Sequence, residues 1–452
     1  MWGASDHFRF VWLKTSGDVA VEASVRFTDS QPDSGEAQPH RKACLVIRQT
    51  LDSSAAYADA ALHADGLTSL QWREAPGAPT HEVQSAVTGP TRLRIEKRGD
   101  YVSMYVAEGA EPLRPSGGAT KITLSGEFYV GLGVSAHDTT RIETATFSDV
   151  RVERVPSVAQ TGPVISTVET ISLRSKDRRV AAVEIEPSPV LGAWWYPDSS
   201  RTLYYRGSMG TLSRVQAQLP GRVTSTSRGA LPQRVSSGLA SCSDCTTADT
   251  GRRWSVREID DTHASPVLLL SWIESTSAAF ESGNADPELG MIARWSPDGS
   301  ALAFASLTDN QIHLVRARSR QPVKITSQGR NADPVFSPDG RYVYFSSDRS
   351  GRWQLWRVSV DGSAPEQLTR DDFDDTHPYL SPDGRSIAFL SFDARANSRG
   401  ALRDARLRLL SLADGRIDEL AKLLGSDTSL GAYPWSPDGE YLAFVSYQRE
   451  PR

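Results

Sequence analysis

The densest group of titratable side chains in the chain is the run Asp371–His377, which reads DDFDDTH. Its carboxylates stand beside an imidazole, a combination that could bind a divalent cation or perform general acid–base catalysis. The same run could instead be an acidic loop between two structural units, with the histidine as a cap. Both interpretations stay open on the sequence alone.

A turn motif, Ser381-Pro382-Asp383-Gly384, follows this run and recurs along the chain. Proline presets φ near −65° and glycine tolerates positive φ, so the motif predicts a tight turn. The motif's aspartate stands at positions 298, 339, 383 and 438, and a degenerate copy has its aspartate at 198. Because the turn itself recurs, we expect these aspartates to accept backbone hydrogen bonds and not to act as catalytic acids.

Each turn belongs to a unit of short strands, of which Asn331–Arg370 is the complete example. Strands rich in aromatic and β-branched residues alternate there with turns. A repeat of roughly 40 to 55 residues with four strands is typical of a β-propeller. The interval from Asp198 to Asp298 spans two such periods, so the spacing predicts six blades.

The last copy of the unit ends after its second strand, near Tyr447. Two earlier segments, Thr167–Ser172 and Arg179–Glu184, read as strands without a turn motif of their own. We expect them to complete the last blade, so that pairing of the N- and C-terminal strands closes the ring and removes exposed sheet edges.

The repeat, WSPDG with a strand after it, then a D-x-x-G-x-x-x-(I/L)-W/Y strand and a Q-L-T strand, resembles the TolB-type propeller repeat. The resemblance implies a propeller over residues 167–452. Blades of this type occur in periplasmic scaffolds, in peptidase propeller domains and in a few polysaccharide lyases, so the resemblance implies a fold and leaves the function open. The chain has no G-x-S-x-G elbow that would indicate an attached serine peptidase.

In a propeller the first strand of each blade lines the central channel, and a ligand meets the residues just before the turn. These positions supply the candidate ligand-binding residues of the propeller: Arg294, Asp333, Asp375, His377 and Tyr433. If the protein is an enzyme, Asp333, Asp375 and His377 are its candidate catalytic residues. An enzyme would need at least two of these groups close to a common point.

Residues 1–153 differ from the propeller and read as many short strands with no long helical period, which predicts a β-sandwich. Alternation on Lys42–Gln49, Tyr57–His63 and Thr68–Arg73 places one set of side chains in the core and the other on an open face. That face would carry planar polar groups beside an aromatic ring, as sugar binding requires. It could also be a solvated outer sheet with paired charges. Its residues are Arg48, Tyr57, Asp59, His63, Gln71 and Arg73.

The hairpin Leu93–Tyr101 and the closing segment Phe128–Val150 resemble a concanavalin-like, laminin-G-like jelly roll of the kind found ahead of TolB-type propellers. In that architecture a strand or two precede the segment that matches Met1-Trp2-Gly3, so we expect that either the sandwich tolerates the loss of its first strands or the true start lies upstream. Residues 154–166 contain two prolines and small polar residues, and we expect them to form a short linker.

Composition sets further limits. The net charge of −5 argues against a nucleic-acid surface. No apolar run has the length of a transmembrane segment, and no signal peptide opens this chain. Three cysteines, Cys44, Cys242 and Cys245, do not make a disulfide framework. Cys242 and Cys245 have zinc-knuckle spacing and are weak metal candidates; two ordinary thiols or a local disulfide are the alternatives.

The sequence therefore predicts an all-β chain: a jelly-roll sandwich followed by a six-bladed propeller. We expect a monomeric, non-enzymatic binding or scaffold protein whose sandwich binds a glycan and whose channel mouth binds a carbohydrate or protein partner. The alternative is a carbohydrate-active enzyme, a polysaccharide lyase or glycoside hydrolase, at the channel mouth. We expect no cofactor, with a divalent cation as the open exception. The resemblance implies a periplasmic or extracellular location, and a cytoplasmic one stays open.

Overall fold

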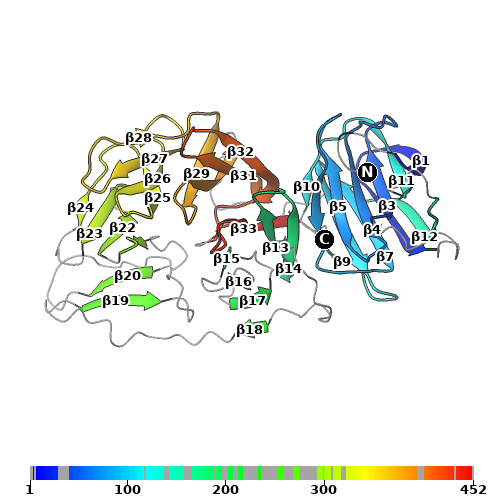
Figure 1. Cartoon of the computed structure of the whole chain (residues 1–452), viewed down its shortest axis with the longest axis horizontal. Coiled ribbons are helices and arrows are strands. Elements are labelled where there is room, and N and C mark those ends of the chain that lie inside the picture. The colour runs from blue at the N-terminus through cyan, green and yellow to red at the C-terminus, as the bar shows by residue number, and fades with distance from the viewer. Residues whose placement is uncertain are drawn as a thin grey trace.

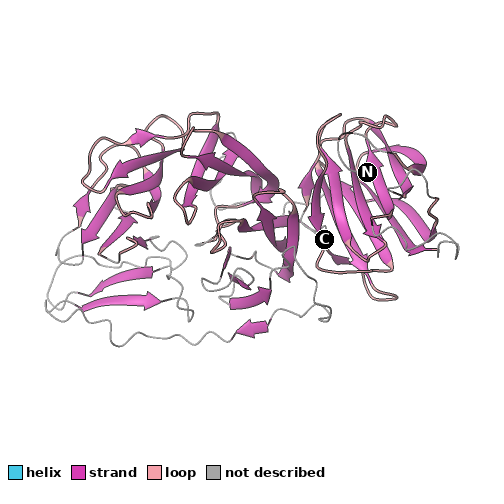
Figure 2. Ribbon diagram, viewed as in Figure 1, coloured by secondary structure: helices cyan, strands magenta, loops and turns pink. Residues whose placement is uncertain are grey.

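In the computed structural model, the chain folds into strands, turns and loops, with no helix among the residues described (Figure 2). The structure describes residues 4, 7–28, 40–116, 119–136, 142–156, 164–186, 190, 192–195, 202–206, 212–216, 233–235, 253–258, 268–273, 293–298, 300–306, 309–316, 322–393, 402–431 and 434–449. The all-β fold class is confirmed. No helix in these segments has the length and apolar character to cross a membrane.

The N-terminal part is a sandwich of two antiparallel sheets (Figure 1). The first has the order β1 (Arg9–Ser16), β11 (Glu127–Ser135), β3 (Lys42–Arg48), β4 (Tyr57–His63), β5 (Thr68–Arg73) and β6 (His81–Gln84). The second has the order β10 (Thr120–Lys121), β8 (Tyr101–Ala107), β7 (Arg92–Arg98), β2 (Val19–Phe27) and β12 (Ala145–Arg154), with β9 (Arg114–Pro115) beside β8.

The core of the sandwich lies between these sheets and follows the alternation of the strands. Leu45 and Ile47 on β3, Leu70 and Trp72 on β5, and Ile95 on β7 all point into it and are buried. Removing each large apolar side chain from water contributes roughly 1.5–3 kcal/mol, so this layer is the main stabilising element of the sandwich.

The edge strand β1 approaches β11 closely at Gly131. A Cβ atom at this position would lie 1.9 Å from the carbonyl oxygen of Val11, so only glycine fits there. Gly131→Ala is therefore expected to displace β1 and to lower the free energy of unfolding by about 1–3 kcal/mol. Trp12 packs edge-on against Tyr129 at 4.9 Å, so tryptophan fluorescence should report the displacement.

Thermal unfolding of Gly131→Ala measures this cost, and Glu108→Ala, at an exposed position directly after β8, is the control. A Gly131→Ala chain with unchanged melting temperature and Trp12 emission would contradict the assignment of β1 to this edge.

The C-terminal part is built from further antiparallel sheets whose neighbours follow one another along the chain. One sheet has β15 (Ala193–Trp195), β16 (Thr202–Arg206), β17 (Leu212–Gln216) and β18 (Gln233–Val235). The next has β19 (Arg253–Glu258), β20 (Leu268–Ile273), β21 (Ala293–Trp295), β22 (Ala301–Ala305), β23 (Ile312–Arg316) and β24 (Val323–Lys324).

Two more complete sheets of the propeller follow. The first has β25 (Asn331–Phe336), β26 (Tyr342–Ser347), β27 (Gln354–Ser359) and β28 (Glu366–Gln367). The second has β29 (Phe373–Leu380), β30 (Ser386–Asp393), β31 (Arg403–Ser411) and β32 (Ile417–Gly425). Because β19 and β20 share one sheet with β21–β24, the count of six blades stays a prediction, as do the domain boundaries.

The repeated turn is held by its own polar groups. At Asp339 the carboxylate accepts hydrogen bonds from the Ser337 hydroxyl at 2.5 Å and from the Arg341 amide at 3.0 Å. Gly340 has φ of 69°, a conformation that glycine adopts without strain. Hydrogen bonds from Ser296 and then Ser300 likewise lower the pKa of Asp298 to about 2. These aspartates are thus occupied as acceptors in the turn.

The ring closes through the two ends of the propeller. Strand β33 (Tyr441–Arg449) pairs antiparallel with β13 (Val164–Ser172), and β14 (Arg178–Glu186) pairs with the other edge of β13. Trp435 forms a bridge to Leu442 on the inner side of β33. The predicted closure by N- and C-terminal strands is confirmed.

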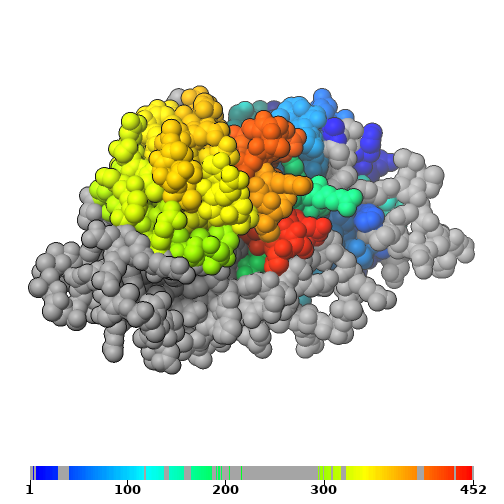
Figure 3. Space-filling model, turned by 60° about the vertical axis from the view of Figure 1, so that its left-hand side comes forward, coloured from blue at the N-terminus to red at the C-terminus, as the bar shows by residue number. Residues whose placement is uncertain are grey.

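The blade that closes the ring, formed by β14, β13 and β33, also joins the sandwich. Its outer strand β14 pairs in parallel with β6, with Arg178 opposite Val83 and Arg179 opposite Gln84. One nine-stranded sheet therefore runs from β1 through the sandwich to β33. Figure 3 shows the neighbouring blade, coloured orange, directly against the blue sandwich. The sequence predicted a short linker between the two domains but not a shared sheet.

Candidate functional site

The candidate site in the propeller lies on β25 and β29, the inner strands of two adjacent sheets (Figure 1). The antiparallel register of each strand shifts at one point, between Ala332 and Val335 and between Thr376 and Tyr379. The residue that precedes the proline at each shift has a left-handed backbone.

These two residues are Asp333, with φ of 54°, and His377, with φ of 57°. A left-handed backbone costs a residue with a side chain roughly 1–2 kcal/mol, so the surrounding sheet must hold it in place. Such strain concentrates at functional sites, which makes the two positions candidates for binding.

The two strained residues meet each other. The His377 Nε2 atom lies 3.6 Å from the Asp333 Oδ1 atom. The hydroxyl of Ser346 on β26 donates to the Asp333 Oδ2 atom at 3.1 Å and accepts from the His377 amide at 3.2 Å. Ser346 is fully buried, while both side chains of the pair are 15% exposed. One hydroxyl thus positions an Asp–His pair that solvent can reach.

Thr376 completes the arrangement, because its hydroxyl lies 3.0 Å from the His377 Nδ1 atom. The pair offers carboxylate and imidazole groups to a hydrogen-bond donor or a cationic side chain. Among the residues that the structure describes, no three His, Cys, Asp or Glu side chains form a group suited to a metal ion.

Asp375 does not join this pair. Its carboxylate turns into its own blade, where it accepts from the Ser391 hydroxyl at 2.6 Å and from Arg408 at 3.3 Å. Burial, helped by repulsion from Asp371, raises the pKa of Asp375 to about 7, against the opposing hydrogen bond from Ser391. The structure therefore brings together two of the three candidate catalytic residues.

Of the other two channel candidates, the structure describes only Arg294. Arg294 is buried, and its guanidinium carbon lies 6.0 Å from the centre of the Tyr379 ring. Tyr433 lies outside the described residues. Cys242 and Cys245, the weak metal candidates, also lie outside them.

On the sandwich, the structure brings the predicted polar residues together. Strands β3, β4 and β5 are neighbours, with Arg48 opposite Tyr57, Tyr57 opposite Arg73 and Asp59 opposite Gln71. The prediction of an open face is nevertheless wrong. All six residues are buried, with exposures of 4% or less: Arg48, Tyr57, Asp59, His63, Gln71 and Arg73.

The polar groups of this buried face have hydrogen-bond partners inside the protein. Gln71 accepts from Lys42 at 2.7 Å and donates to Glu82 at 2.8 Å. Arg73 donates to the carbonyl oxygens of residues 78 and 55 at 3.1 Å and stacks over the Tyr57 ring at 4.9 Å. Such internal partners offset the cost of burying charged and amide groups. The face is a polar interior layer and gives a saccharide no open surface.

Sequence reasoning missed Ser346, which links the two strained residues. The residue is the next to last of β26, in a polar Ser-Ser-Asp run without a recognisable motif, and only the pairing of β25 with β26 brings it beside Asp333. A signal for the pair itself was present, because Asp333 and His377 each precede a proline at the same distance from the turn motif.

Comparison with known proteins places the chain among TolB-like sequences. The family model for the TolB beta propeller domain matches residues 262–421. An uncharacterized protein of Agrobacterium fabrum is 30% identical over 291 residues, which are 63% of this chain and 94% of that relative. The Tol-Pal system protein TolB of Bordetella pertussis is 38% identical over 28% of this chain and 50% of its own length.

A solved structure from Agrobacterium tumefaciens that carries the TolB name is similar with a TM-score of 0.46 and 26% identity, covering 64% of this chain and 100% of its own. The family match contains both Asp333 and His377.

Proposed function

This chain belongs to the TolB β-propeller family, and from that premise we propose that it is a non-enzymatic binding protein. Its propeller has six blades and presents the Asp333–His377 pair, at the channel mouth, to a segment of a partner protein. The sandwich is concanavalin-like and spans residues 1–153, joined by residues 154–166 to a propeller of residues 167–452. The protein acts as a monomer in the periplasm or outside the cell.

One observation carries the proposal: two strained residues from different blades meet at 3.6 Å and remain partly exposed. A carboxylate held beside an imidazole recognises a donor such as a lysine, an arginine or a backbone amide. The buried Ser346 hydroxyl holds the Asp333 carboxylate and the backbone amide of His377 in place before a partner arrives, which lowers the entropic cost of binding.

A carbohydrate-active enzyme is the second candidate, because an Asp–His pair can also move protons. General acid–base catalysis would require the pair to come within hydrogen-bond distance of the reacting atoms. The carboxylate of Asp375 turns away from the pair and accepts from Ser391 instead, so it does not serve as a second carboxylate there, which favours binding over catalysis.

Asp333→Asn is expected to weaken binding of a partner peptide about 10- to 100-fold, because it removes the charge from a hydrogen bond worth roughly 1.5–3 kcal/mol. Linear peptides selected from a random phage library against the whole chain supply the ligands, and calorimetry measures each Kd. Asp361→Asn, at an exposed turn of the same blade, is the matched control and should leave Kd unchanged.

Equal affinity of the wild-type and Asp333→Asn chains for every selected peptide would reject the channel mouth as the binding site. Release of unsaturated or reducing sugar ends from a panel of polysaccharides by the wild-type chain, abolished in His377→Gln, would establish the enzyme instead.

A further inference from the structure

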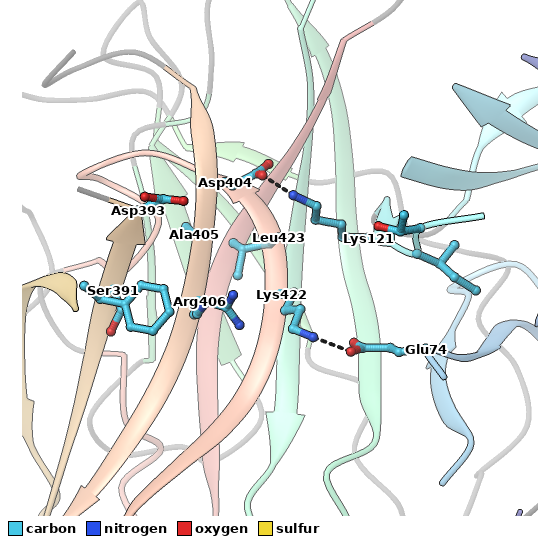
Figure 4. A pocket seen from close by; sticks show the side chains of 12 residues that line it. Glu74, Lys121, Ser391, Asp393, Asp404, Ala405, Arg406, Lys422 and Leu423 are labelled. Atoms are coloured by element: carbon cyan, nitrogen blue, oxygen red, sulfur yellow. Dashed lines mark hydrogen bonds and ion pairs between the residues drawn. The ribbon is translucent and has the colours of Figure 1, made fainter. Parts of the chain in front are cut away.

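The seam between the sandwich and the propeller contains a cleft of about 310 Å³ (Figure 4). We refer to it as the seam cleft. The sandwich contributes Glu74 and the segment that begins with Lys121 on β10. The propeller contributes one sheet, through side chains of β29 to β32. The volume is at the lower end of the range for small-molecule sites, roughly 300–1,000 Å³.

Two ion pairs cross the seam and flank the cleft (Figure 4). Lys121 pairs with Asp404, which also accepts from the Tyr101 hydroxyl. Lys422 pairs with Glu74. Although burial opposes ionisation, the hydrogen bonds from Lys121 and Tyr101 lower the pKa of Asp404, so that its carboxylate is ionised at neutral pH.

The charges of the lining balance. Its cations are Lys121, Arg406 and Lys422, and its anions are Glu74, Asp393 and Asp404. The paired side chains keep 27% to 49% of their surface exposed, so they retain atoms that a ligand can reach. A charged ligand would meet as many like as opposite charges, whereas a neutral ligand meets no net repulsion.

A hydroxyl group suits such a lining because it both donates and accepts. It can donate to the carboxylate of an ion pair and accept from the ammonium group of the same pair without separating them. Phe373, which is half-buried, adds an apolar surface to the lining, whereas Ile122 and Leu423 are buried, with 2% and 1% of their surface exposed. A ligand that suits this lining is therefore uncharged and carries several hydroxyl groups on a partly apolar ring. Neutral sugars have these properties.

The walls of the cleft are also fixed in advance. The parallel pairing of β6 with β14 ties the two domains through backbone hydrogen bonds. Gln448 on the closing strand bonds to the Tyr105 hydroxyl of the sandwich, which adds a second tie. Preorganised walls reduce the entropy lost on binding.

We propose that the seam cleft binds a neutral saccharide of one or two rings, or the end of a longer chain. This site is separate from the Asp333–His377 pair and does not depend on the function proposed for it.

The test uses the whole chain and titrates it by calorimetry with maltose, cellobiose, lactose and N,N′-diacetylchitobiose. Digalacturonate and chitosan disaccharide are the charged comparisons. At least one neutral sugar should bind, and Thr123→Trp should weaken it by about tenfold or more, because Thr123 is exposed and lines the cleft. Ser125→Trp, exposed and outside the lining, should bind like wild type.

Asp404→Asn provides a second variant that leaves the cleft open. It removes one acceptor and gives the lining a net positive charge, so we expect weaker binding of the neutral sugar and a gain for digalacturonate. Asp333→Asn should not change sugar binding, which separates this test from that of the channel pair. No binding by any neutral sugar, preference of the wild type for a charged one, or full affinity in Thr123→Trp would overturn the proposal.

Discussion

Arg178→Met is expected to lower the free energy of unfolding by about 3–5 kcal/mol, the usual cost of breaking a buried ion pair from one side. The Arg178 guanidinium donates twice to Glu169, at 2.8 and 2.9 Å, and the two residues are 1% and 0% exposed. Without the arginine, the Glu169 carboxylate stays buried with only the Ser446 hydroxyl described as a further donor.

The position of this pair makes the effect large. Arg178 starts the strand that pairs with the sandwich, and its guanidinium carbon lies 5.5 Å from the rings of both Trp72 and Phe444. It therefore contacts the sandwich, the closing strand β33 and the strand β13 at once. Loss of the side chain should loosen both the ring closure and the seam.

Urea unfolding followed by far-ultraviolet circular dichroism measures the loss. Arg174→Met, in the exposed turn before β14, is the matched control and should change stability by no more than about 0.5 kcal/mol. The double variant Arg178→Met/Glu169→Leu should recover most of the loss, because it removes the unpaired charge as well. If the single and double variants were equally unstable, lost packing and not the stranded carboxylate would explain the effect.

The sequence predicted the parts of the fold that are encoded locally. The Ser-Pro-Asp-Gly turn needs only the residues of the motif, and the structure shows its aspartate bonded as expected. Strands β4 and β5 have the predicted bounds, Tyr57–His63 and Thr68–Arg73. Ring closure was also predictable, because an unfinished last repeat leaves strands to be supplied from elsewhere in the chain.

What the sequence could not predict depends on contacts between distant segments. Alternation placed Asp59 and Gln71 on one face, but it does not tell whether something covers that face. The pairing of β6 with β14 joins strands far apart in the chain, and a short edge strand such as His81–Gln84 has no pattern that marks its partner. The charges that meet across the seam, Lys121 and Asp404, resemble any other surface charges until the domains are placed together.

The strained pair falls between these two cases. Proline after Asp333 and after His377 disfavours the helical backbone at the preceding residue, so an irregular position could be expected there. The direction of each side chain depends on the bulge and on Ser346 from the next strand. Sequence position therefore identified Asp333 and His377 as candidates. The side chain of Asp375, two positions before His377, points into its own blade instead, where it bonds to Ser391 and Arg408.

Asp375→Asn is expected to make the chain more stable at neutral and alkaline pH. The pKa of Asp375 is raised to about 7 by burial and by the nearby Asp371 carboxylate. In the unfolded chain the same carboxyl group titrates near its ordinary pKa of 3.8. Between these two values the folded state holds a proton that the unfolded state has released, so raising the pH destabilises the folded state.

The size of this effect follows from the shift. Each pH unit within the window costs about 1.4 kcal/mol, which gives an upper limit of about 4 kcal/mol above pH 7. Asparagine has the shape of the protonated acid, and its amide oxygen can accept from Ser391 and Arg408 as the carboxyl oxygen does. The variant therefore keeps the contacts and loses only the titration.

Urea unfolding of wild-type and Asp375→Asn chains at pH values from 5 to 8 measures the difference. We expect the stability advantage of the variant to be already about 1.5 kcal/mol at pH 5, to grow as the pH rises and to level off above about pH 7. Asp371→Asn is the informative second variant, because removing the neighbouring charge should lower the pKa of Asp375 and move the window to lower pH. A difference between Asp375→Asn and wild type that stays constant with pH would mean that Asp375 is ionised throughout. Its ion pair with Arg408, 3.3 Å away, would then outweigh its burial.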